Sequence, residues 1–274
     1  MLYSKGVSAM IKELTEKRRS FRTFDGRRPD QAVLDELMER LNMAQMPFAA
    51  FMEFRLLDNM SSPVISGTDL YIAGKCRYTE PMAEVMFGYV LEEAMLYMLE
   101  QGLGSVWIGG TMDRKAFEAK MDLQADEIMP AVTPVGYPAR KMSLKETLMR
   151  KGVKADSRMP FMELFFRDSF GCPLTETDAG QYLMPLQTVQ AAPSAVNKQP
   201  WRVVVRDGAV HFFERHDKGY VTEKSDMQKL DMGIAMCHFD LARKEAGLHG
   251  SWAVNDPDIS TPENTEYIAS FIAE

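Results

Sequence analysis

The chain has 274 residues, of which 46% are hydrophobic and 26% are charged, a composition that is typical of a folded protein and excludes a disordered one. Its formal net charge of −7 disfavours nonspecific binding to nucleic acid or anionic lipid, so any site for an anion needs a local concentration of arginine. The three cysteines are far apart and form no Cys-x-x-Cys motif, so we expect neither a disulfide framework nor a metal site. We expect no membrane span, because no apolar run approaches about 18 residues, and a cytoplasmic location, because no export signal is visible.

The first predicted element is a helix over residues 7–17, and a basic cluster follows it directly. Residues 17–24 read KRRSFRTF. Arginine binds phosphate through paired hydrogen bonds, and a serine hydroxyl adds another donor. The sequence therefore indicates an anion site, although a solvated basic helix end, favoured by the helix dipole, explains the same residues. The candidate anion-binding residues are Arg18, Arg19, Ser20 and Arg22.

A helix and a strand come next, and the same pair recurs in the second half of the chain. Residues 29–44 have apolar side chains at helical spacing, and a strand is predicted over residues 51–57. The counterpart helix is predicted over residues 175–192, where Thr175 and Asp178 resemble a capping box. Its strand is predicted over residues 201–206.

The clearest internal repeat lies between residues 87–107 and residues 232–252. Each copy predicts a long amphipathic helix that ends at a glycine in the C′ position, followed by a strand that carries a tryptophan. We expect the two long helices, over residues 81–101 and 228–246, to pack against each other at the centre of the molecule. At one constant offset the matched pairs are Gly88 and Gly233, Leu96 and Leu241, Gly102 and Gly247, Leu103 and Leu248, and Trp107 and Trp252.

Each half ends in a further strand, over residues 131–137 and 266–274, which gives the order helix, strand, helix, strand, strand twice. The predicted fold class is α+β, with two repeats of a helix-flanked, mainly antiparallel sheet. We assign residues 1–160 to the first repeat and residues 161–274 to the second. Two equal copies are typical of a fused homodimer with a pseudo-twofold axis, and two independent tandem domains are the alternative.

Two further segments contain features of a binding site, one in each half. Residues 191–205 read AAPSAVNKQPWRVVV, a rigid loop that can present polar groups to a ligand, or else an ordinary turn. Residues 102–111 read GLGSVWIGGT, where Gly109 and Gly110 would let a planar ligand lie against backbone N–H groups. An ordinary strand-to-helix turn is the alternative there. Neither segment is retained in the other half.

These segments together resemble the FMN-dependent nitroreductase family. The resemblance is carried by RRSFRTF, GLGSVWIGG, PVGYP and APSAVNKQPWRVVV, and it extends over most of the chain. Because the last motif lies in the second repeat, the chain is similar to the fused, pseudo-dimeric TM nitroreductase subgroup. The resemblance implies a nitroreductase-like fold arranged as a pseudo-homodimer, with one FMN per chain in the cleft between the repeats.

The resemblance also implies roles for individual residues. The arginine cluster would hold the FMN phosphate and ribityl chain, with Arg22 nearest the pyrimidine edge of the ring, and Arg158 would also reach the phosphate. Residues of the second repeat would line the flavin, and a backbone N–H of the glycine segment would lie near N5. The lining residues are Pro193, Ser194, Ala195 and Asn197, and the residues over the ring are Val106, Trp107, Ile108, Gly109 and Gly110.

The implied activity is reduction of nitroaromatic or quinone-like acceptors by NADH or NADPH, through ping-pong hydride transfer. No side chain is assigned as a catalytic acid or base. A different reaction on the same fold (dehalogenation, flavin destruction or enone reduction) is one alternative, and a flavin-binding protein without catalysis is another. We expect the partner to be a small aromatic molecule and the chain to be a monomer. We also expect His211 and His216 to be strand or surface residues and not ligands.

Overall fold

The computed structural model describes residues 11–274. The part of the predicted first helix that precedes Ile11 lies outside the described residues. The elements of the first half are α1 (Ile11–Lys17), α2 (Gln31–Asn42), β1 (Met52–Leu57), β2 (Tyr71–Arg77), α3 (Ala83–Glu100), α4 (Arg114–Met121), β3 (Glu127–Ile128) and β4 (Val132–Pro134).

The remaining elements begin with a connecting segment and continue into the second half. They are α5 (Leu144–Gly152), α6 (Phe161–Leu164), β5 (Phe165–Arg167), the 3-10 turn η1 (Gly180–Tyr182), α7 (Leu183–Ala191), the 3-10 turn η2 (Ala195–Asn197), β6 (Trp201–Arg206), β7 (Ala209–Arg215), α8 (Met227–Glu245), β8 (Gly250–Ala253) and β9 (Thr265–Ala273). Among the described residues, no helix is long and apolar enough to cross a membrane.

Each half forms its own sheet, and the two sheets have related topologies. In the first sheet β1 pairs antiparallel with β2, which pairs antiparallel with both β3 and β4. The second sheet has the order β5-β6-β7-β9-β8, in which only the β5–β6 pair is parallel. Strand β9 of the second sheet thus occupies the place that β3 and β4 share in the first, beside the central strand.

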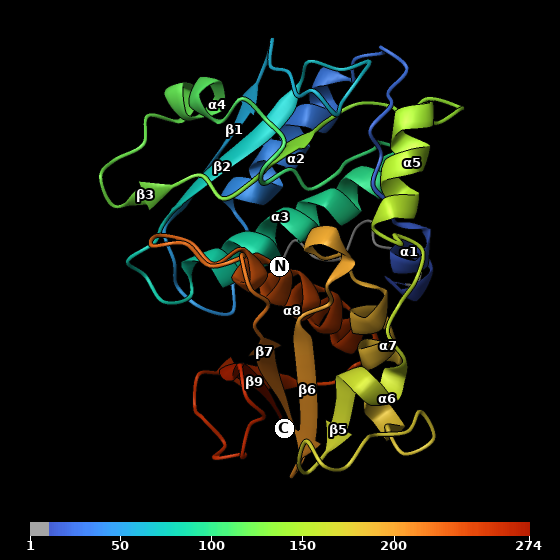
Figure 1. Ribbon diagram of the computed structural model, residues 1–274, viewed down its shortest axis with the longest axis vertical. Helices are drawn as coiled ribbons and strands as arrows, with labels where there is room; N and C mark the ends of the chain where they lie inside the picture. The colour runs from blue at the N-terminus through green and yellow to red at the C-terminus, as the bar shows by residue number, and fades with distance from the viewer. Residues whose placement is uncertain (1–10) are drawn as a thin grey trace.

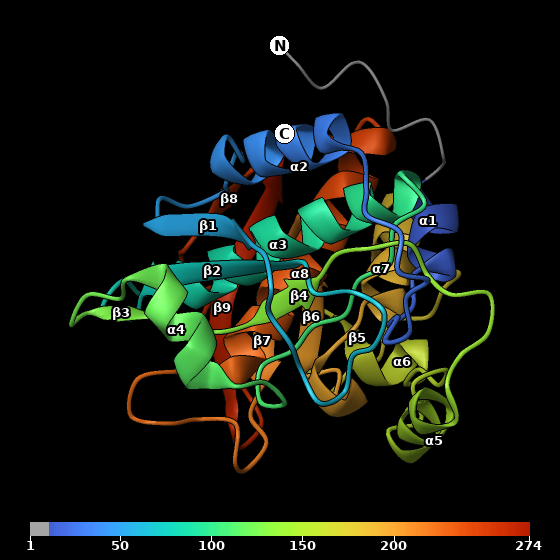
Figure 2. The ribbon, with the colours of Figure 1, turned by 90° about the horizontal axis from the view of Figure 1, so that it is seen from above.

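The two long helices α3 and α8 lie side by side between the sheets (Figure 1). The first sheet, with α2, lies at one end of the molecule and the second sheet at the other. Seen from above, α2 and α4 lie on opposite faces of the first sheet (Figure 2). Side chains of β2 alternate between these faces, as the period of two requires. Ile72 and Cys76 belong to the main core, whereas Tyr71 and Ala73 belong to a smaller core with α4.

The crossing of α3 and α8 has approximate twofold symmetry. Gly88 of α3 lies against the backbone of Leu230, and a Cβ there would overlap the carbonyl oxygen of that residue. Gly233 of α8 lies against the backbone of Val85 in the same way. Since the offset that matches Gly88 with Gly233 also matches Val85 with Leu230, the two contacts are equivalents exchanged between the halves, which is the signature of an isologous interface. The predicted central packing of the two long helices is confirmed.

Both long helices also end as predicted. Gly102 and Gly247 follow them with φ of +73° and +71°, left-handed values that favour glycine. The next residue in each case bonds back into the helix: the N–H of Leu103 to Met98 O at 2.8 Å, and that of Leu248 to Arg243 O at 2.9 Å. Glycines at equivalent positions of the repeat therefore end both helices with the same C-terminal motif.

The predicted order of elements is wrong in three places. The first half has two strands before its long helix and the second half has three, so β2, β5 and β7 are missing from the predicted unit. The tryptophan-bearing strand of the first half is reduced to isolated bridges, such as that between Ile108 and Val132, while its counterpart is the regular strand β8. The helix predicted from residue 175 begins only at Leu183, although Thr175 Oγ1 does bond Asp178 Oδ2 at 2.6 Å.

Candidate functional site

The arginine-rich segment that follows α1 lies against the segment that carries the glycine pair. The N–H of Phe21 donates to Ser105 O at 2.9 Å. The side chain of Phe21 packs on Gly104, and a side chain at Gly104 would crowd it. Further along, Thr23 Oγ1 donates to Glu146 Oε2 at 2.8 Å, which attaches α5 to the same segment. Two of the motifs found in the sequence are therefore neighbours in the fold.

Glu92, a fully buried carboxylate of α3, holds residues from three parts of the chain. Its Oε1 lies 2.8 Å from Arg18 Nε and 3.0 Å from His238 Nε2 of α8, and its Oε2 accepts a hydrogen bond of 2.8 Å from the Trp107 indole. Burial raises the pKa of this carboxyl group, but the charge of Arg18 and the His238 contact lower it by more, so the pKa lies below its usual value. Glu92 therefore stays ionised and fixes Arg18 beside the α3–α8 crossing.

Three other arginines lie near Arg18, and the positive charges repel one another. Burial lowers the pKa of Arg22, Glu146 offsets part of that effect, and the charges of Arg150 and Arg18 lower the pKa further. Burial and the charges of Arg18 and Arg150 lower the pKa of Arg158, and Asp156, which pairs with Arg150, offsets part of this effect. The Arg18 side chain is only 6% exposed, and its Nη2 has no hydrogen-bond partner among the described residues. An unpaired buried donor therefore lies among several positive charges.

The loop of the second half lies against α8 and is held in an unusual backbone conformation. Both carboxylate oxygens of Asp231 lie near the N–H of Ala195, at 3.0 and 3.2 Å. Val196, Asn197 and Gln199 all have positive φ, of 50°, 58° and 51°. This conformation is costly for a β-branched residue such as Val196, and strained non-glycine residues of this kind concentrate at functional sites.

Arg158 connects this loop with the arginine cluster. Its guanidinium donates to Ala191 O at 2.9 Å and approaches Asn197 Oδ1 at 3.4 Å. The Asn197 amide in turn donates to the carbonyls of Lys154 and Ser157, at 2.8 and 3.0 Å. Because Arg158 lies at the end of the first repeat, these bonds join the first repeat to the loop of the second.

The glycine segment reaches the same part of α8. Gly109 packs against the side chain of Met227, the first residue of that helix, and Gly110 is exposed. Because Met227 and Asp231 are four residues apart, they lie on one face of α8. Gly109 from the first half and Ala195 from the second therefore approach neighbouring turns of the same helix face.

Not every predicted residue joins this arrangement. The guanidinium of Arg19 lies over the ring of Phe21, 4.7 Å from its centroid, and is exposed. Ser20, Pro193 and Ser194 are half-buried, and Ser194 Oγ caps its own loop by accepting from the N–H of Gln199 at 2.8 Å.

The sequence did not single out Glu92, Asp231 or His238, which position the predicted residues. A charged residue inside an apolar stretch, such as Asp231 within residues 230–237, is the signal that could have found them. Glu92 gives no such signal. It is followed directly by Glu93, and the sequence does not show which of the two faces the core.

The second half contains a related carboxylate whose partners are complete. Asp240 of α8 accepts from Tyr89 of α3 at 2.7 Å, from the Trp252 indole at 2.8 Å and from Arg243 at 2.7 Å, and it pairs with Lys244 at 2.6 Å. Like Glu92, it thus binds a tryptophan of its own half, a residue of the opposite long helix and an arginine. The difference is that its cations are paired locally, whereas Arg18 retains an unpaired donor.

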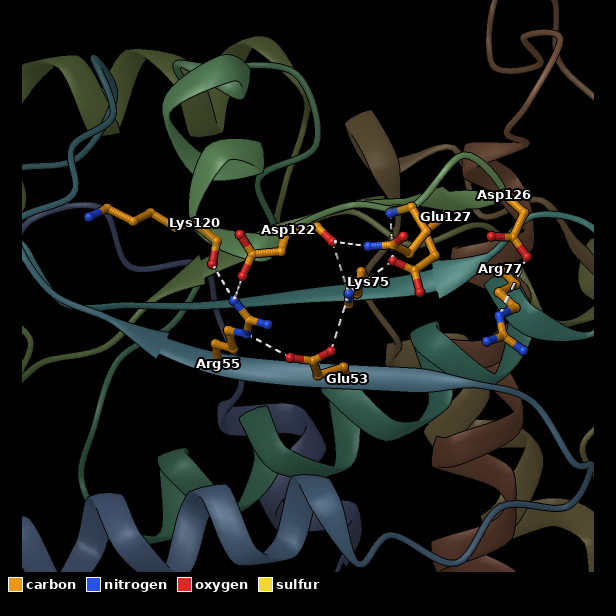
Figure 3. Close-up of polar contacts among 9 residues, drawn as sticks. Glu53, Arg55, Lys75, Arg77, Lys120, Asp122, Asp126 and Glu127 are labelled. Carbon is orange, nitrogen blue, oxygen red and sulfur yellow. Dashed lines mark hydrogen bonds and ion pairs between the residues drawn. The ribbon is translucent and has the colours of Figure 1, made fainter.

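Another charged cluster, on the first sheet, is also internally paired (Figure 3). Lys75, which is buried, lies 3.2 Å from Glu53 and 2.9 Å from Glu127, and Arg55 bonds Glu53 and Asp122 at 2.6 and 2.7 Å. Opposite charges pair with each other here, so this cluster ties β1, β2 and β3 together.

Comparison with known proteins identifies the fold and the family. The crystal structure of a nitroreductase from Thermotoga maritima MSB8 is 20% identical, with a TM-score of 0.62 over 99% of this chain and 97% of that one. A nitroreductase family protein from Clostridium difficile 630 is 18% identical, with a TM-score of 0.43 over 56% of this chain and 94% of that one. An FMN-dependent nitroreductase from Clostridium difficile R20291 is 16% identical, with a TM-score of 0.37 over 50% and 94%. Comparison with curated proteins gives no match.

A family model gives the most direct assignment. Residues 10–243 match the model described as "Putative TM nitroreductase", and this range includes the arginine cluster, the glycine segment, the second-half loop, α3 and all but the last two residues of α8. The first of the structural neighbours has the same α+β fold over nearly its whole length. The chain therefore belongs to the TM nitroreductase family.

Proposed function

We propose that the protein binds one FMN per chain between its two halves and acts as an NAD(P)H-dependent oxidoreductase of nitroreductase type. The observation that carries the proposal is the buried, unpaired Nη2 of Arg18 within a group of arginines that repel one another. A phosphate ester, with up to two negative charges and several acceptor oxygens, fits such a group, because it would pair the free donor and relieve the repulsion.

The surroundings of the arginine cluster also suit a flavin. Arg18, Arg22 and Arg150 would hold the phosphate end, and Arg158 would keep the loop of residues 193–197 in place beside it. The segment of residues 106–110 and that loop would then enclose the ring from the first and second halves. Only one such site is expected per chain, since the related carboxylate Asp240 has its cations paired internally.

FMN, when bound, accepts a hydride from NADH or NADPH and passes reducing equivalents to an acceptor such as a nitroaromatic or a quinone. The protein contributes position and electrostatics. Arg22 is the residue that we expect to favour negative charge at the pyrimidine edge of the ring, because the fold holds it half-buried beside other cations. We expect the nicotinamide and the acceptor to occupy the same open face in turn, which gives ping-pong kinetics, and solvent to supply the protons.

The proposal is tested by the visible spectrum and the flavin content of the purified chain. We expect one FMN per chain, bleaching by NADH or NADPH, and turnover of a nitroaromatic whose products are identified. Arg18→Ala should weaken FMN binding about 10- to 100-fold, which corresponds to roughly 1.5–3 kcal/mol for hydrogen bonds to a charged group. Arg19→Ala should weaken it less, since that side chain lies over Phe21.

Arg28→Ala is the matched control, because Arg28 is exposed and paired with Asp58 at 2.6 Å. It should retain FMN at the wild-type level. Two flavins per chain, or none, would contradict the proposal of a single site, and stoichiometric FMN in an Arg18→Ala, Arg22→Ala double variant would remove the assignment of the arginine cluster.

A further inference from the structure

A second group of polar side chains lies away from the arginine cluster, where the end of β7, the start of β9 and the start of α8 meet. It consists of Glu214, His216 and Asp226. Each residue offers one donor atom, and these atoms lie within 4.8 Å of one another. Strand β7 supplies the glutamate, the residue after the strand is the histidine, and the aspartate is the N-cap of α8.

The donor atoms of this group lie close to one another. His216 Nδ1 lies 2.9 Å from Glu214 Oε1 and 3.6 Å from Asp226 Oδ2. The Glu214 side chain is fully buried, and among the described residues neither of its oxygens, nor His216 Nδ1, has a hydrogen-bond partner outside the group itself. Buried polar atoms without partners are rare in folded proteins and indicate an absent ligand, water or ion.

Two of the three separations between these atoms match those of donors that share one metal ion. Imidazole nitrogen and carboxylate oxygen bind Zn²⁺ at about 2.0–2.2 Å. Two donors on the same tetrahedral or octahedral ion therefore lie about 3.0–3.5 Å apart by simple geometry. The observed values of 2.9 and 3.6 Å are close to this range.

The other polar atoms of the His216 and Asp226 side chains have partners outside the group. His216 Nε2 lies 3.3 Å from Glu266 Oε2, and Glu266 is held by Lys229 at 3.4 Å. Asp226 Oδ1 accepts from the N–H of Gln228 at 3.0 Å, which leaves Oδ2 directed at the histidine. A carboxylate on the outer nitrogen of a histidine is the arrangement that orients imidazole ligands in metal sites.

The local charge also favours a cation. Three carboxyl groups, those of Glu214, Asp226 and Glu266, face one lysine and one imidazole, and burial together with the charges of Asp226 and Glu266 raises the pKa of Glu214 to about 9. A fourth, Glu84 of α3, accepts from the N–H of Asp226 at 2.9 Å. A divalent ion would compensate this excess of negative charge at the point where the unpaired atoms converge.

We propose that Glu214, His216 and Asp226 form a binding site for a divalent first-row transition-metal ion that joins β7 to α8. One nitrogen and two carboxylate donors suit Zn²⁺ or Mn²⁺, whereas Ca²⁺ and Mg²⁺ prefer all-oxygen sites. The expectation from the sequence that His216 is not a ligand is revised by this proposal. The acidic partners come from three separate elements, so the local sequence HFFERH could not reveal them.

The test uses the full chain without an affinity tag, stripped with a chelator and then titrated calorimetrically with Zn²⁺, Mn²⁺ and Ca²⁺. We expect one Zn²⁺ per chain, weaker or absent binding of Ca²⁺, and a rise in Tm with Zn²⁺. His216→Ala should fold, since the side chain is 26% exposed, and should lose at least tenfold in Zn²⁺ affinity together with the rise in Tm. Glu214→Gln should lose affinity as strongly, and Glu266→Gln should lose about 10- to 100-fold as an outer-shell change.

His249→Ala and Glu263→Gln are the matched controls, because both residues are exposed. They should bind Zn²⁺ like the wild type. The proposal is overturned if His216→Ala binds Zn²⁺ as tightly as the wild type, if Ca²⁺ binds equally well, or if the wild type binds no Zn²⁺. FMN content is measured in the same samples, and since none of these variants alters the arginine cluster, it reports separately on the proposed function.

Discussion

Asp231 is a carboxylate that the fold buries almost completely while giving it a backbone donor, the N–H of Ala195. Burial raises its pKa well above the usual value, the Ala195 bond opposes that effect in part, and the charges of Asp226 and Glu92 add to it. The native state therefore retains a proton here to higher pH than the unfolded chain does. The residue positions the loop of residues 193–197 at some expense in stability.

This leads to a prediction about pH. Because the native pKa is raised, the contribution of Asp231 to stability is greatest below the unfolded pKa of about 3.9 and is lost as pH rises toward the native pKa. Asp231→Asn keeps an acceptor for the Ala195 N–H but does not titrate. We expect the stability of Asp231→Asn relative to the wild type to be greater at pH 8 than at pH 5.

Urea unfolding at the two pH values measures this difference. Asp30→Asn is the control, because Asp30 is exposed and its side chain caps nothing. Its stability relative to the wild type should be the same at both pH values. A difference between Asp231→Asn and the wild type that does not change with pH would contradict the buried, protonated state of Asp231.

The residues of the candidate site were predictable from the sequence to the extent that they form local motifs. The cluster of Arg18, Arg19, Ser20 and Arg22 has short spacing and an unusual charge density against an acidic chain, so the sequence alone marked it. The residues that position it, Glu92 and His238, carry no local signal because they become partners only when α3 crosses α8. Tertiary contacts between distant elements are the part that no single motif encodes.

Among the elements, the crossing of α3 and α8 makes the sharpest demand on the sequence. Gly88 and Gly233 allow the two backbones to approach so closely that a single added methyl group at either position would overlap a carbonyl oxygen. Gly88→Ala or Gly233→Ala should each destabilise the protein by about 3 kcal/mol, the upper part of the range for overpacking a core. Because the two sites share one crossing, a helix displaced by the first alanine should accommodate the second. The double variant should therefore lose less stability than the sum of the two single losses.

Gly152→Ala is the matched control for this pair. Gly152 ends α5, has no left-handed φ and has open space around the position of a Cβ. Alanine there should be neutral or stabilising by up to about 1 kcal/mol. Chemical unfolding of the four variants measures all these values, and additive losses from the two crossing glycines would argue against a shared contact.

The strands differ in how far their sequences define them. The segment WRVVVR predicts β6 with its observed bounds, because a short run of apolar, β-branched residues favours a strand. β7 was omitted from the predicted unit although Asp207 and Gly208, both with left-handed φ, form the two-residue turn that marks a hairpin. β2 gives a weaker signal, since it contains Gly74, whose missing side chain accommodates the rings of Phe54 and Phe87.

At the scale of the whole molecule, the two halves have kept a common framework and lost equivalence in chemistry. The long helices and their glycine stops occur at equivalent positions in both halves, and each half has a tryptophan–carboxylate bond, although Glu92 and Asp240 are not equivalent positions of the repeat. In the first half Arg18 pairs with Glu92 but keeps an unpaired Nη2, whereas in the second Arg243 and Lys244 neutralise Asp240. Once the halves are covalently joined, one site can be retained while the other is filled with internal pairs, since a single chain no longer requires identical subunits.

The last prediction concerns how the halves unfold. The main core is continuous across them: Leu34 and Val85 of the first half belong to the same cluster as Phe212 and Phe239 of the second. Since neither sheet can bury its inner face without the α3–α8 pair, we expect residues 1–160 and 161–274 to unfold in one cooperative transition. Guanidinium unfolding should give the same midpoint by far-UV circular dichroism and by tryptophan fluorescence, and hydrogen exchange should give both long helices the same protection. An earlier loss of one half would instead support independent tandem domains, the alternative that the repeat in the sequence left open.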